Sequence, residues 1–174
     1  MAVASVPPSR PPWHGSVDVT DVQPLDLSFT LVTEAEAPPG LDDRELEPLV
    51  AFVLATEQAA GPWDVTVALV DDERLQELHC AFMGIDTPTD IMTFPNNEAG
   101  EELNGGELVI SVDHAMTQAG AWGLSPEEEI TFLVTHGLLH LLGWRDDTDE
   151  QRRSMLERQQ RLFDEWRSGT PAGI

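Results

Sequence analysis

The feature that most constrains this chain is the segment 135–147, an apolar run with histidines at 136 and 140, a glycine at 143 and carboxylates directly after it. Because positions i and i+4 lie on the same face of a helix, both imidazoles can reach one metal ion. Gly143 can take the left-handed conformation that ends a helix, so the chain can turn back and bring Asp146 to the same ion. Two histidines and an aspartate with one open position are typical of a catalytic zinc site rather than a structural one.

The alternative interpretation is a chance His-x3-His pair that packs without a metal. Three features favour the metal: an unpartnered imidazole is costly in an apolar helix, a glycine falls where the chain must reverse, and a carboxylate follows. Zinc proteases carry a glutamate directly after the first histidine as general base, whereas this chain has Gly137 there. The pattern therefore predicts metal ligands at His136, His140 and Asp146 and weakens a peptidase interpretation.

Length and composition indicate a globular protein. With 174 residues, 41% of them hydrophobic, the chain is long enough for one domain with a proper core. Residues 1–16 are rich in proline and lack the apolar segment of a signal peptide, so we expect a disordered leader there and a single domain at residues 17–168. The single cysteine fits a reducing compartment, and no apolar stretch is long enough to span a membrane. We therefore expect a cytoplasmic protein without a membrane partner.

The chain is strongly acidic, with a net charge of −23 from 32 acidic and 9 basic residues. Taken alone, this charge argues against a nucleic-acid partner, because phosphate binding relies on lysine and arginine. A second interpretation is adaptation to a salty cytoplasm, where a Debye length of about 3 Å screens self-repulsion at molar salt. The acidic residues are spread over the whole chain rather than gathered in a tail, which favours the second interpretation.

Hydrophobic periodicity predicts strands at residues 25–31, 65–70, 89–94 and 107–111. Helices are predicted to begin at Asp42 or Asp43, at 71–73, at 111–113 and at Ser125, with Gly61-Pro62 ending the first and Leu142 ending the fourth; a capping box at Thr148 and Gln151 starts the last. This order predicts an α+β fold in which helices cover a small mixed four-stranded sheet. The side chains expected to face inward from the second and fourth helices are those of Leu75, Leu78, Phe82, Leu133, Val134, Leu138 and Leu141.

Three motifs, DTPTDIMTFP at 86–95, GELVIS at 106–111 and HGLLHLLGW at 136–144, occur in the order found in a known family. With them the chain resembles, over residues 25 to 165, the YbeY family of single-domain, zinc-dependent bacterial endoribonucleases that mature rRNA. The resemblance implies a zincin-like metal helix, one Zn²⁺ per chain and an rRNA precursor or ribosomal subunit as partner. It also places Asp90 and Glu107 inside family motifs, where each either accepts the N–H of a metal-bound imidazole or is a sheet-edge or turn-capping acid, the second role being favoured for Glu107.

Two departures from the family pattern matter for function. The family's commonest third ligand is histidine, whereas Asp146 would give zinc an oxygen ligand at about 2.0–2.2 Å and make the ion less electrophilic. The family also usually has Tyr-Arg-Gly where this chain has Phe82-Met83-Gly84, and a methionine cannot hold a phosphate. His114 and Arg145 are the candidate catalytic residues that would replace this arginine, although either is equally well explained as a surface residue.

Two functions remain open at this point. The first is a zinc-dependent endoribonuclease acting in rRNA maturation and ribosome quality control, which the open ligand position favours. The second is a ribosome-assembly binding factor with a mainly structural zinc and little turnover, which Met83 and the acidic charge favour. Trp144 is expected to pack over the end of the metal helix rather than to stack on a base.

The acidic composition generates a first prediction. If it is an adaptation to a salty cytoplasm, the free energy of unfolding should rise as KCl increases from dilute buffer toward molar concentration, because salt screens the repulsion between carboxylates. Urea unfolding at several KCl concentrations measures this dependence. Equal stability in dilute buffer and in molar KCl would contradict the adaptation.

Overall fold

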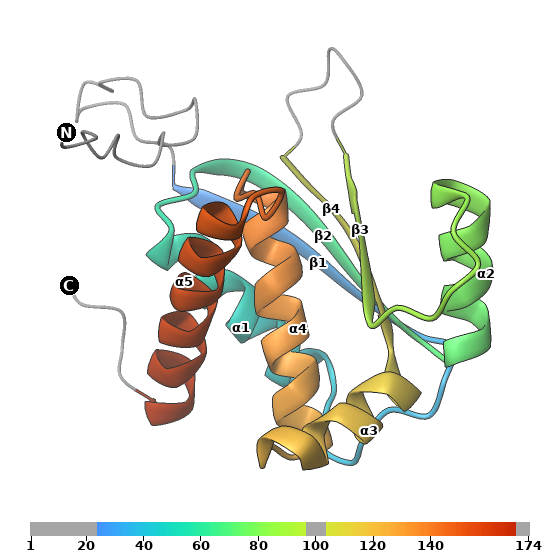
Figure 1. The fold of residues 1–174 in the computed structure, drawn as a ribbon. Helices are drawn as coiled ribbons and strands as arrows, with labels where there is room; N and C mark the ends of the chain where they lie inside the picture. Colours follow the sequence, from blue (N-terminus) through green and yellow to red (C-terminus); the bar gives the residue numbers. More distant parts are fainter. Residues whose placement is uncertain (1–23, 97–103, 170–174) are drawn as a thin grey trace, which may run out of the picture.

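The computed structural model of the chain describes residues 24–96 and 104–169, so the leader predicted at residues 1–16 lies outside the described residues. The described elements follow the predicted order of strands and helices (Figure 1). They are β1 (Leu25–Thr33), α1 (Asp43–Thr56), β2 (Gly61–Val70), α2 (Asp72–Met83), β3 (Ile91–Pro95), β4 (Asn104–Ser111), α3 (Val112–Trp122), α4 (Pro126–Leu141) and α5 (Asp149–Ser168). None of the described helices is long and apolar enough to cross a membrane.

The four strands form one mixed sheet in the order β1-β2-β4-β3. Strands β1, β2 and β4 run parallel to their neighbours, and β3 pairs antiparallel with β4 at the edge. The fold is therefore α+β with a small mixed sheet, as predicted from the element order.

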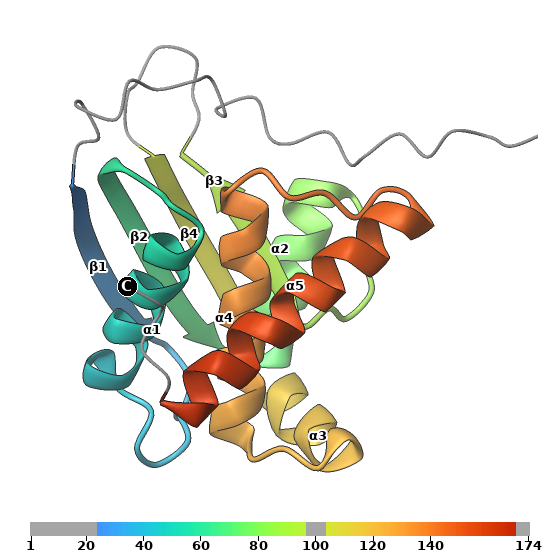
Figure 2. The same ribbon diagram turned by 90° about the vertical axis from the view of Figure 1, so that its left-hand side faces the viewer.

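Helices cover both faces of this sheet, and alternate residues of the strands supply the two cores. Helices α1 and α4 pack on one face, with α5 packed outside them, while α2 packs on the other face (Figures 1 and 2). In β4, Leu108 and Ile110 face the larger core under α4, whereas Val109 faces the smaller core with Leu75 of α2. Strand β2 is buried on both sides, as its apolar sequence predicts.

The structure corrects two predicted boundaries. Helix α1 already ends at Thr56, and Gly61 and Pro62 open strand β2 instead of ending the helix; proline is tolerated at the start of a strand. Strand β4 begins at Asn104, three residues before the predicted start, and so includes Gly105 and Gly106. A Cβ on Gly105 would lie 1.9 Å from the carbonyl oxygen of Asp64, so glycine here reflects close strand approach rather than a loop.

Two burial predictions are also corrected. Leu75 is fully buried, but Phe82 in the last turn of α2 is 66% exposed, although its ring meets that of Phe94 on β3. In α4, Leu133, Val134 and Leu138 are buried as predicted, whereas Leu141, in the last turn, is half-buried.

Helix α4 approaches the sheet most closely at Gly137. A Cβ at this position would lie 2.6 Å from Cδ2 of Leu108 and 3.0 Å from Cδ1 of Ile91. At the position that carries the general base of zinc proteases, any side chain would therefore press on the side-chain ends of Leu108 and Ile91, which would have to move. This steric constraint gives a physical reason for the departure seen in the sequence.

The close approach predicts opposite effects of alanine at two helical glycines. Gly137→Ala should destabilise the protein by about 1–3 kcal/mol because the added methyl overpacks the contact with Leu108. Gly120→Ala is the matched control: a Cβ there meets no atom within 4 Å, so alanine should stabilise α3 by about 0.5–1 kcal/mol. Urea unfolding of both variants measures the difference, and equal stabilisation of both would contradict the packing.

Candidate metal centre

Helix α4 and the turn after it position all three predicted ligands. The helix begins at a capping box in which Ser125 and Glu128 bond each other's backbone N–H, with Pro126 in the first turn. It ends at Leu141, after which Gly143 takes a positive φ of 91°. The N–H of Trp144 then donates to the carbonyl of Leu139 at 2.9 Å, which turns the chain back along the helix. The glycine stop therefore acts as the sequence predicts.

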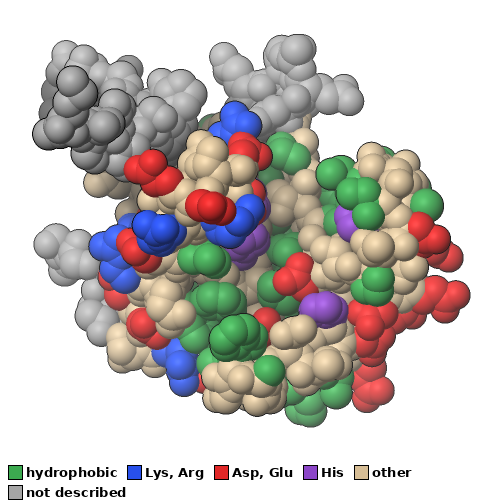
Figure 3. Space-filling view, in the orientation of Figure 1, with side chains coloured by type: hydrophobic (Ala, Val, Ile, Leu, Met, Phe, Trp, Pro, Cys, Tyr) green, Lys and Arg blue, Asp and Glu red, His purple; other side chains and the backbone are tan. Residues whose placement is uncertain are grey.

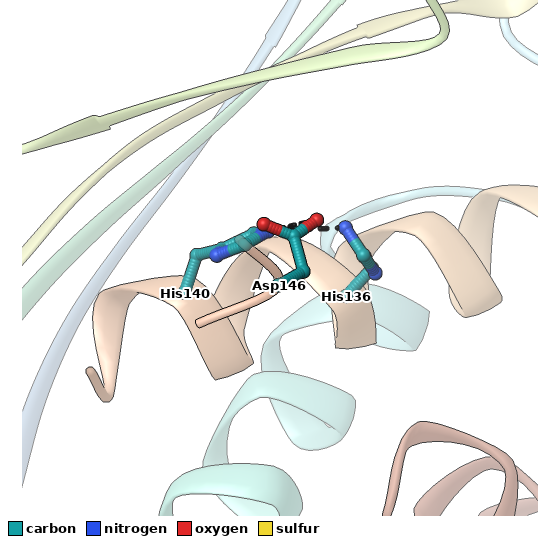
Figure 4. Close-up of side chains that lie close together, drawn as sticks. All are labelled: His136, His140 and Asp146. Carbon is teal, nitrogen blue, oxygen red and sulfur yellow. Dashed lines mark hydrogen bonds and ion pairs between the residues drawn. The ribbon is translucent and has the colours of Figure 1, made fainter. Parts of the chain in front are cut away.

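The three side chains point toward one another (Figure 4). The Nε2 atoms of His136 and His140 are 3.1 Å apart, and Nε2 of His140 lies 3.8 Å from Oδ2 of Asp146. One ligand atom from each residue lies within 4.8 Å of the others. Asp147 instead pairs with Arg145 at 2.5 Å, so the turn brings Asp146 rather than its neighbour to the histidines.

Hydrogen bonds fix the tautomer of both imidazoles. Nδ1 of His140 lies 3.2 Å from the carbonyl of Trp144, which can only accept, so this nitrogen carries the proton. Nδ1 of His136 lies 3.0 Å from Oε1 of Gln159, and the Gln159 amide is oriented by its own donation to the carbonyl of Phe132 at 3.0 Å. In the neutral rings, both Nε2 atoms therefore present lone pairs to each other, an arrangement that only a shared cation makes favourable.

The electrostatics favour a metal ion over a proton as that cation. Burial lowers the pKa of His140, and the neighbouring His136 lowers it further; Asp146, Asp147 and the Trp144 carbonyl oppose the shift. The imidazole is therefore held in the neutral form that binds metal. For tetrahedral zinc with bonds of about 2.0–2.1 Å, neighbouring ligand atoms lie about 3.3 Å apart, and the observed separations bracket this value. The donor set and its spacing fit a zinc ion.

Two residues outside the candidate ligand set support the histidines. Gln159 is buried on α5 and was missed by the sequence analysis, although it lies on the apolar stripe of that helix between Met155 and Leu162. Trp144 packs against the larger core, as predicted, and its indole N–H donates to Glu57 at 3.1 Å. Glu57 also accepts from Arg158 of α5 at 2.6 Å, so the turn that carries the third ligand is tied to two other helices.

Neither Asp90 nor Glu107 accepts an imidazole N–H group, so that role is wrong for Asp90, and for Glu107 the favoured role of a sheet acid stands. Those protons go to Gln159 and to the Trp144 carbonyl, because the Nδ1 atoms face α5 and the following turn rather than the sheet. The carboxylate of Asp90 accepts from the N–H of Ile91 at 2.8 Å at the start of β3. Glu107 is exposed on β4.

The two candidate catalytic residues lie on different elements. His114 is half-buried in the first turn of α3, where its N–H donates to the hydroxyl of the capping Ser111 at 3.1 Å. Arg145 is exposed in the turn beside Asp146, and its guanidinium contacts Asp147 twice, at 2.5 and 2.6 Å. A phosphate at Arg145 would therefore compete with Asp147 for the guanidinium.

A further acidic residue, Glu129, lies on the ligand-bearing side of α4. Seven residues correspond to about 700° of helix rotation, so Glu129 lies almost directly below His136. Its side chain is buried, and its Oε2 has no hydrogen-bond partner among the described residues. Burial raises the pKa of this carboxyl, the nearby charge of Asp90 raises it further, and His114 opposes the shift. Sequence reasoning missed Glu129 because a glutamate in the first turns of a helix is usually a solvated residue.

Comparisons with known proteins agree with this geometry. A family model described as Endoribonuclease YbeY matches residues 30–167. Endoribonuclease YbeY of Bacillus licheniformis is 36% identical over 137 residues, covering 72% of this chain and 87% of the relative. The Bacillus velezensis protein of the same name is 33% identical over 152 residues, covering 82% of this chain and 97% of the relative. The solution structure of TM1509 from Thermotoga maritima, 27% identical, superposes with a TM-score of 0.56 and covers 84% of this chain and 97% of that one.

The fold and the site together define an α+β protein in which one helix and its following turn bring two histidines and an aspartate into metal-ligand geometry. The family model matches most of the chain, and the two relatives are similar over most of their own length, so the family can be assigned. The chain belongs to the YbeY family.

The raised pKa of Glu129 predicts how stability depends on pH. Folding raises this pKa, so the contribution of Glu129 is fully present below the pKa of an unfolded glutamate and is lost as pH rises through the folded value. Glu129→Gln should therefore be more stable than the parent protein at neutral pH and similar to it at acidic pH. Urea unfolding at both pH values measures the effect.

A neighbouring acid provides the control for this experiment. Glu127→Gln removes the same charge from a half-exposed side chain in the first turn of α4, where a carboxylate interacts favourably with the helix dipole. This variant should gain no stability at neutral pH. An equal gain in both variants would show that general charge reduction, rather than burial of Glu129, is responsible.

Proposed function

We propose that the protein is a zinc-dependent endoribonuclease that acts in rRNA maturation and ribosome quality control. The observation that carries the proposal is the pair of imidazole Nε2 atoms facing each other at 3.1 Å, both with their other nitrogen engaged as donor, beside Asp146. Membership of a family described as an endoribonuclease supports RNA as the substrate. The absence of a base at position 137, where the chain has glycine packed closely against Leu108 and Ile91, disfavours a peptidase.

The residues of the candidate site are suited to metal-dependent hydrolysis. Zinc held by His136, His140 and Asp146 would lower the pKa of a bound water toward neutrality and polarise a phosphoryl oxygen. Gln159 and the carbonyl of Trp144 hold the imidazoles in the tautomer that binds metal. Three protein ligands leave one tetrahedral position open, which distinguishes this arrangement from a closed structural site.

Contacts to the substrate phosphate require a cation that Met83 does not supply. We assign this role to Arg145, which is exposed beside the third ligand, and to His114 at the start of α3. A guanidinium binds phosphate oxygens in a bidentate manner, and a helix N-terminus favours an anion. The substrate in this proposal is an rRNA precursor, free or on a ribosomal subunit, in the cytoplasm.

The alternative function is a ribosome-assembly binding factor with a mainly structural zinc and little turnover. Met83 and the net charge of −23 favour it, because both reduce phosphate binding. Labelled rRNA and casein, each incubated with the purified protein at high salt with and without chelator, separate the candidates. Chelator-sensitive cleavage of RNA supports the nuclease; tight RNA binding without cleavage supports the assembly factor, and cleavage of casein the peptidase.

The ligand set predicts a specific pattern of zinc loss. The parent protein should bind one zinc per chain, His140→Ala should lose it, and Asp146→Ala should bind it more weakly because two ligands remain. Asp146→His should retain zinc. Asp147→Ala is the matched control, because this carboxylate pairs with Arg145 and should leave zinc affinity unchanged. Zinc titration with elemental analysis measures all four variants, and a loss confined to Asp147→Ala would move the third ligand by one residue.

The hydrogen bond from His136 to α5 should also affect the metal. Gln159→Leu removes the acceptor of the Nδ1 proton while keeping an apolar side chain in the core. Loss of such a supporting contact typically weakens metal affinity by about 10- to 100-fold. Zinc titration at constant pH tests this value; unchanged affinity would show that Gln159 serves packing alone.

A further inference from the structure

The C-terminal end of α2 exposes three large apolar side chains close together in sequence. Phe82 is 66% exposed, Met83 62% and Ile85 45%. The helical periodicity predicts that Phe82 faces inward, yet the buried position of this helix is Leu75. Because exposing grouped apolar side chains costs free energy, such a group marks a contact surface. We refer to Phe82, Met83 and Ile85 as the apolar platform.

The apolar platform is held in a fixed geometry. Gly84 ends α2 in the left-handed conformation, and the segment after it is fastened back to the helix. Gln76 donates to Asp86 at 2.8 Å, and Nδ1 of His79 lies 2.8 Å from the carbonyl of Thr87. The Phe82 ring meets the ring of Phe94 on β3 edge-on, with centroids 5.1 Å apart. The exposure is therefore a property of the ordered fold.

The apolar platform and the candidate metal centre flank the same end of β3. Phe94, which contacts Phe82, precedes Pro95, and Pro95 pairs with Gly106 of β4. On the other side of the sheet, Leu141, which follows His140 in the sequence, approaches Gly106. Its Cδ2 atom lies 2.7 Å from the position that a Cβ on Gly106 would occupy. Hydrophobic side chains over α2 and histidines over α4 accordingly appear on one face of the molecule (Figure 3).

The charge of the protein decides how RNA can bind this face. The chain has 9 basic residues against 32 acidic ones, and Asp86 lies directly beside the apolar platform. Phosphates are therefore poorly accommodated there, whereas the faces of the bases carry no net charge. Stacking of a base on an aromatic side chain contributes about 1–3 kcal/mol and tolerates any sequence. A polarisable methionine beside the ring adds a second surface of the same kind.

We propose that the apolar platform is a base-stacking subsite for unpaired RNA whose backbone reaches the metal centre. In this proposal the apolar platform binds the bases of the RNA, whereas an arginine at position 83 would bind a phosphate. A protein partner fits less well, since three side chains fall far short of the roughly 20–30 residues that each side of a stable interface contributes. This inference rests on the proposed endoribonuclease function.

Equilibrium binding of a fluorescein-labelled unpaired oligoribonucleotide, measured by fluorescence anisotropy with chelator present to prevent cleavage, tests the subsite. Phe82→Ala should weaken binding by about 5- to 150-fold, the factor that corresponds to one stacked base. Phe82→Trp should preserve binding because it preserves a stacking surface. Trp122→Ala is the matched control: this ring, 73% exposed at the end of α3, lies outside the apolar platform, and its loss should leave affinity unchanged.

The salt dependence provides an independent measurement. Met83→Arg should add one phosphate contact and steepen the slope of log affinity against log KCl by about 0.7, the value for a single strand. An unchanged slope in this variant, an unchanged affinity in Phe82→Ala, or an equal loss in Trp122→Ala would each overturn the subsite. Thermal unfolding of each variant verifies that the fold is intact.

Cleavage assays with zinc separate this inference from the proposed function. If the parent protein cleaves RNA and Phe82→Ala binds it equally well, the subsite is wrong while the nuclease stands. If the parent protein neither binds nor cleaves RNA at any salt concentration, both are wrong. Raised KM with little change in kcat for Phe82→Ala supports the subsite, because the ring would bind substrate without touching the reacting phosphate.

Discussion

The close packing of α4 on strands β3 and β4 sets the orientation of every group in the candidate site. Gly137 faces Leu108 and Ile91 so closely that a Cβ would lie 2.6 Å from Cδ2 of Leu108 and 3.0 Å from Cδ1 of Ile91. With the helix held in this rotation, His136, His140 and Glu129 lie roughly 60–100° around it, beside the sheet rather than against it. The histidines are therefore placed to face α5 and the following turn, and Glu129 is placed within reach of the charges of Asp90 and His114.

The hydrogen-bond partners of the imidazoles and of Glu129, which lie beside the sheet, explain what these groups can do chemically. Each imidazole has one nitrogen satisfied by a fixed acceptor and the other directed at its neighbour. These two facing nitrogens and Asp146 together form the candidate ligand set. Glu129 is different, because its buried Oε2 has no partner in the described chain and its pKa rises as a consequence. Burial of the Glu129 carboxyl therefore lowers the stability of the protein on the side of α4 where the proposed reaction takes place.

Local features were predictable from the sequence, and features that depend on tertiary packing were not. The capping boxes at Ser125 and Thr148, the turn at Gly143 and the His136–His140–Asp146 set all depend on residues a few positions apart. Gln159 supports His136 from 23 positions away, which no local pattern reveals. Phe82 was assigned inward because helical periodicity cannot show where the sheet below ends. Gly105 fell outside the strand predicted at residues 107–111 because the close approach of the neighbouring strand, which requires a glycine there, is a tertiary contact.

In the turn after α4, the residue that holds the site in place is not the residue that supplies the candidate third ligand. Trp144 holds the turn in place. Its backbone N–H donates to the end of the helix, its carbonyl orients His140, and its indole N–H donates to Glu57. The side chain of Asp146 pairs with His140, while the backbone around it is held by Trp144 and by Arg152, which donates to the Asp146 carbonyl. The side chain at position 146 could therefore change between carboxylate and imidazole while the loop keeps its path. With a candidate site built this way, the donor atom offered to an ion could evolve independently of the fold that presents it.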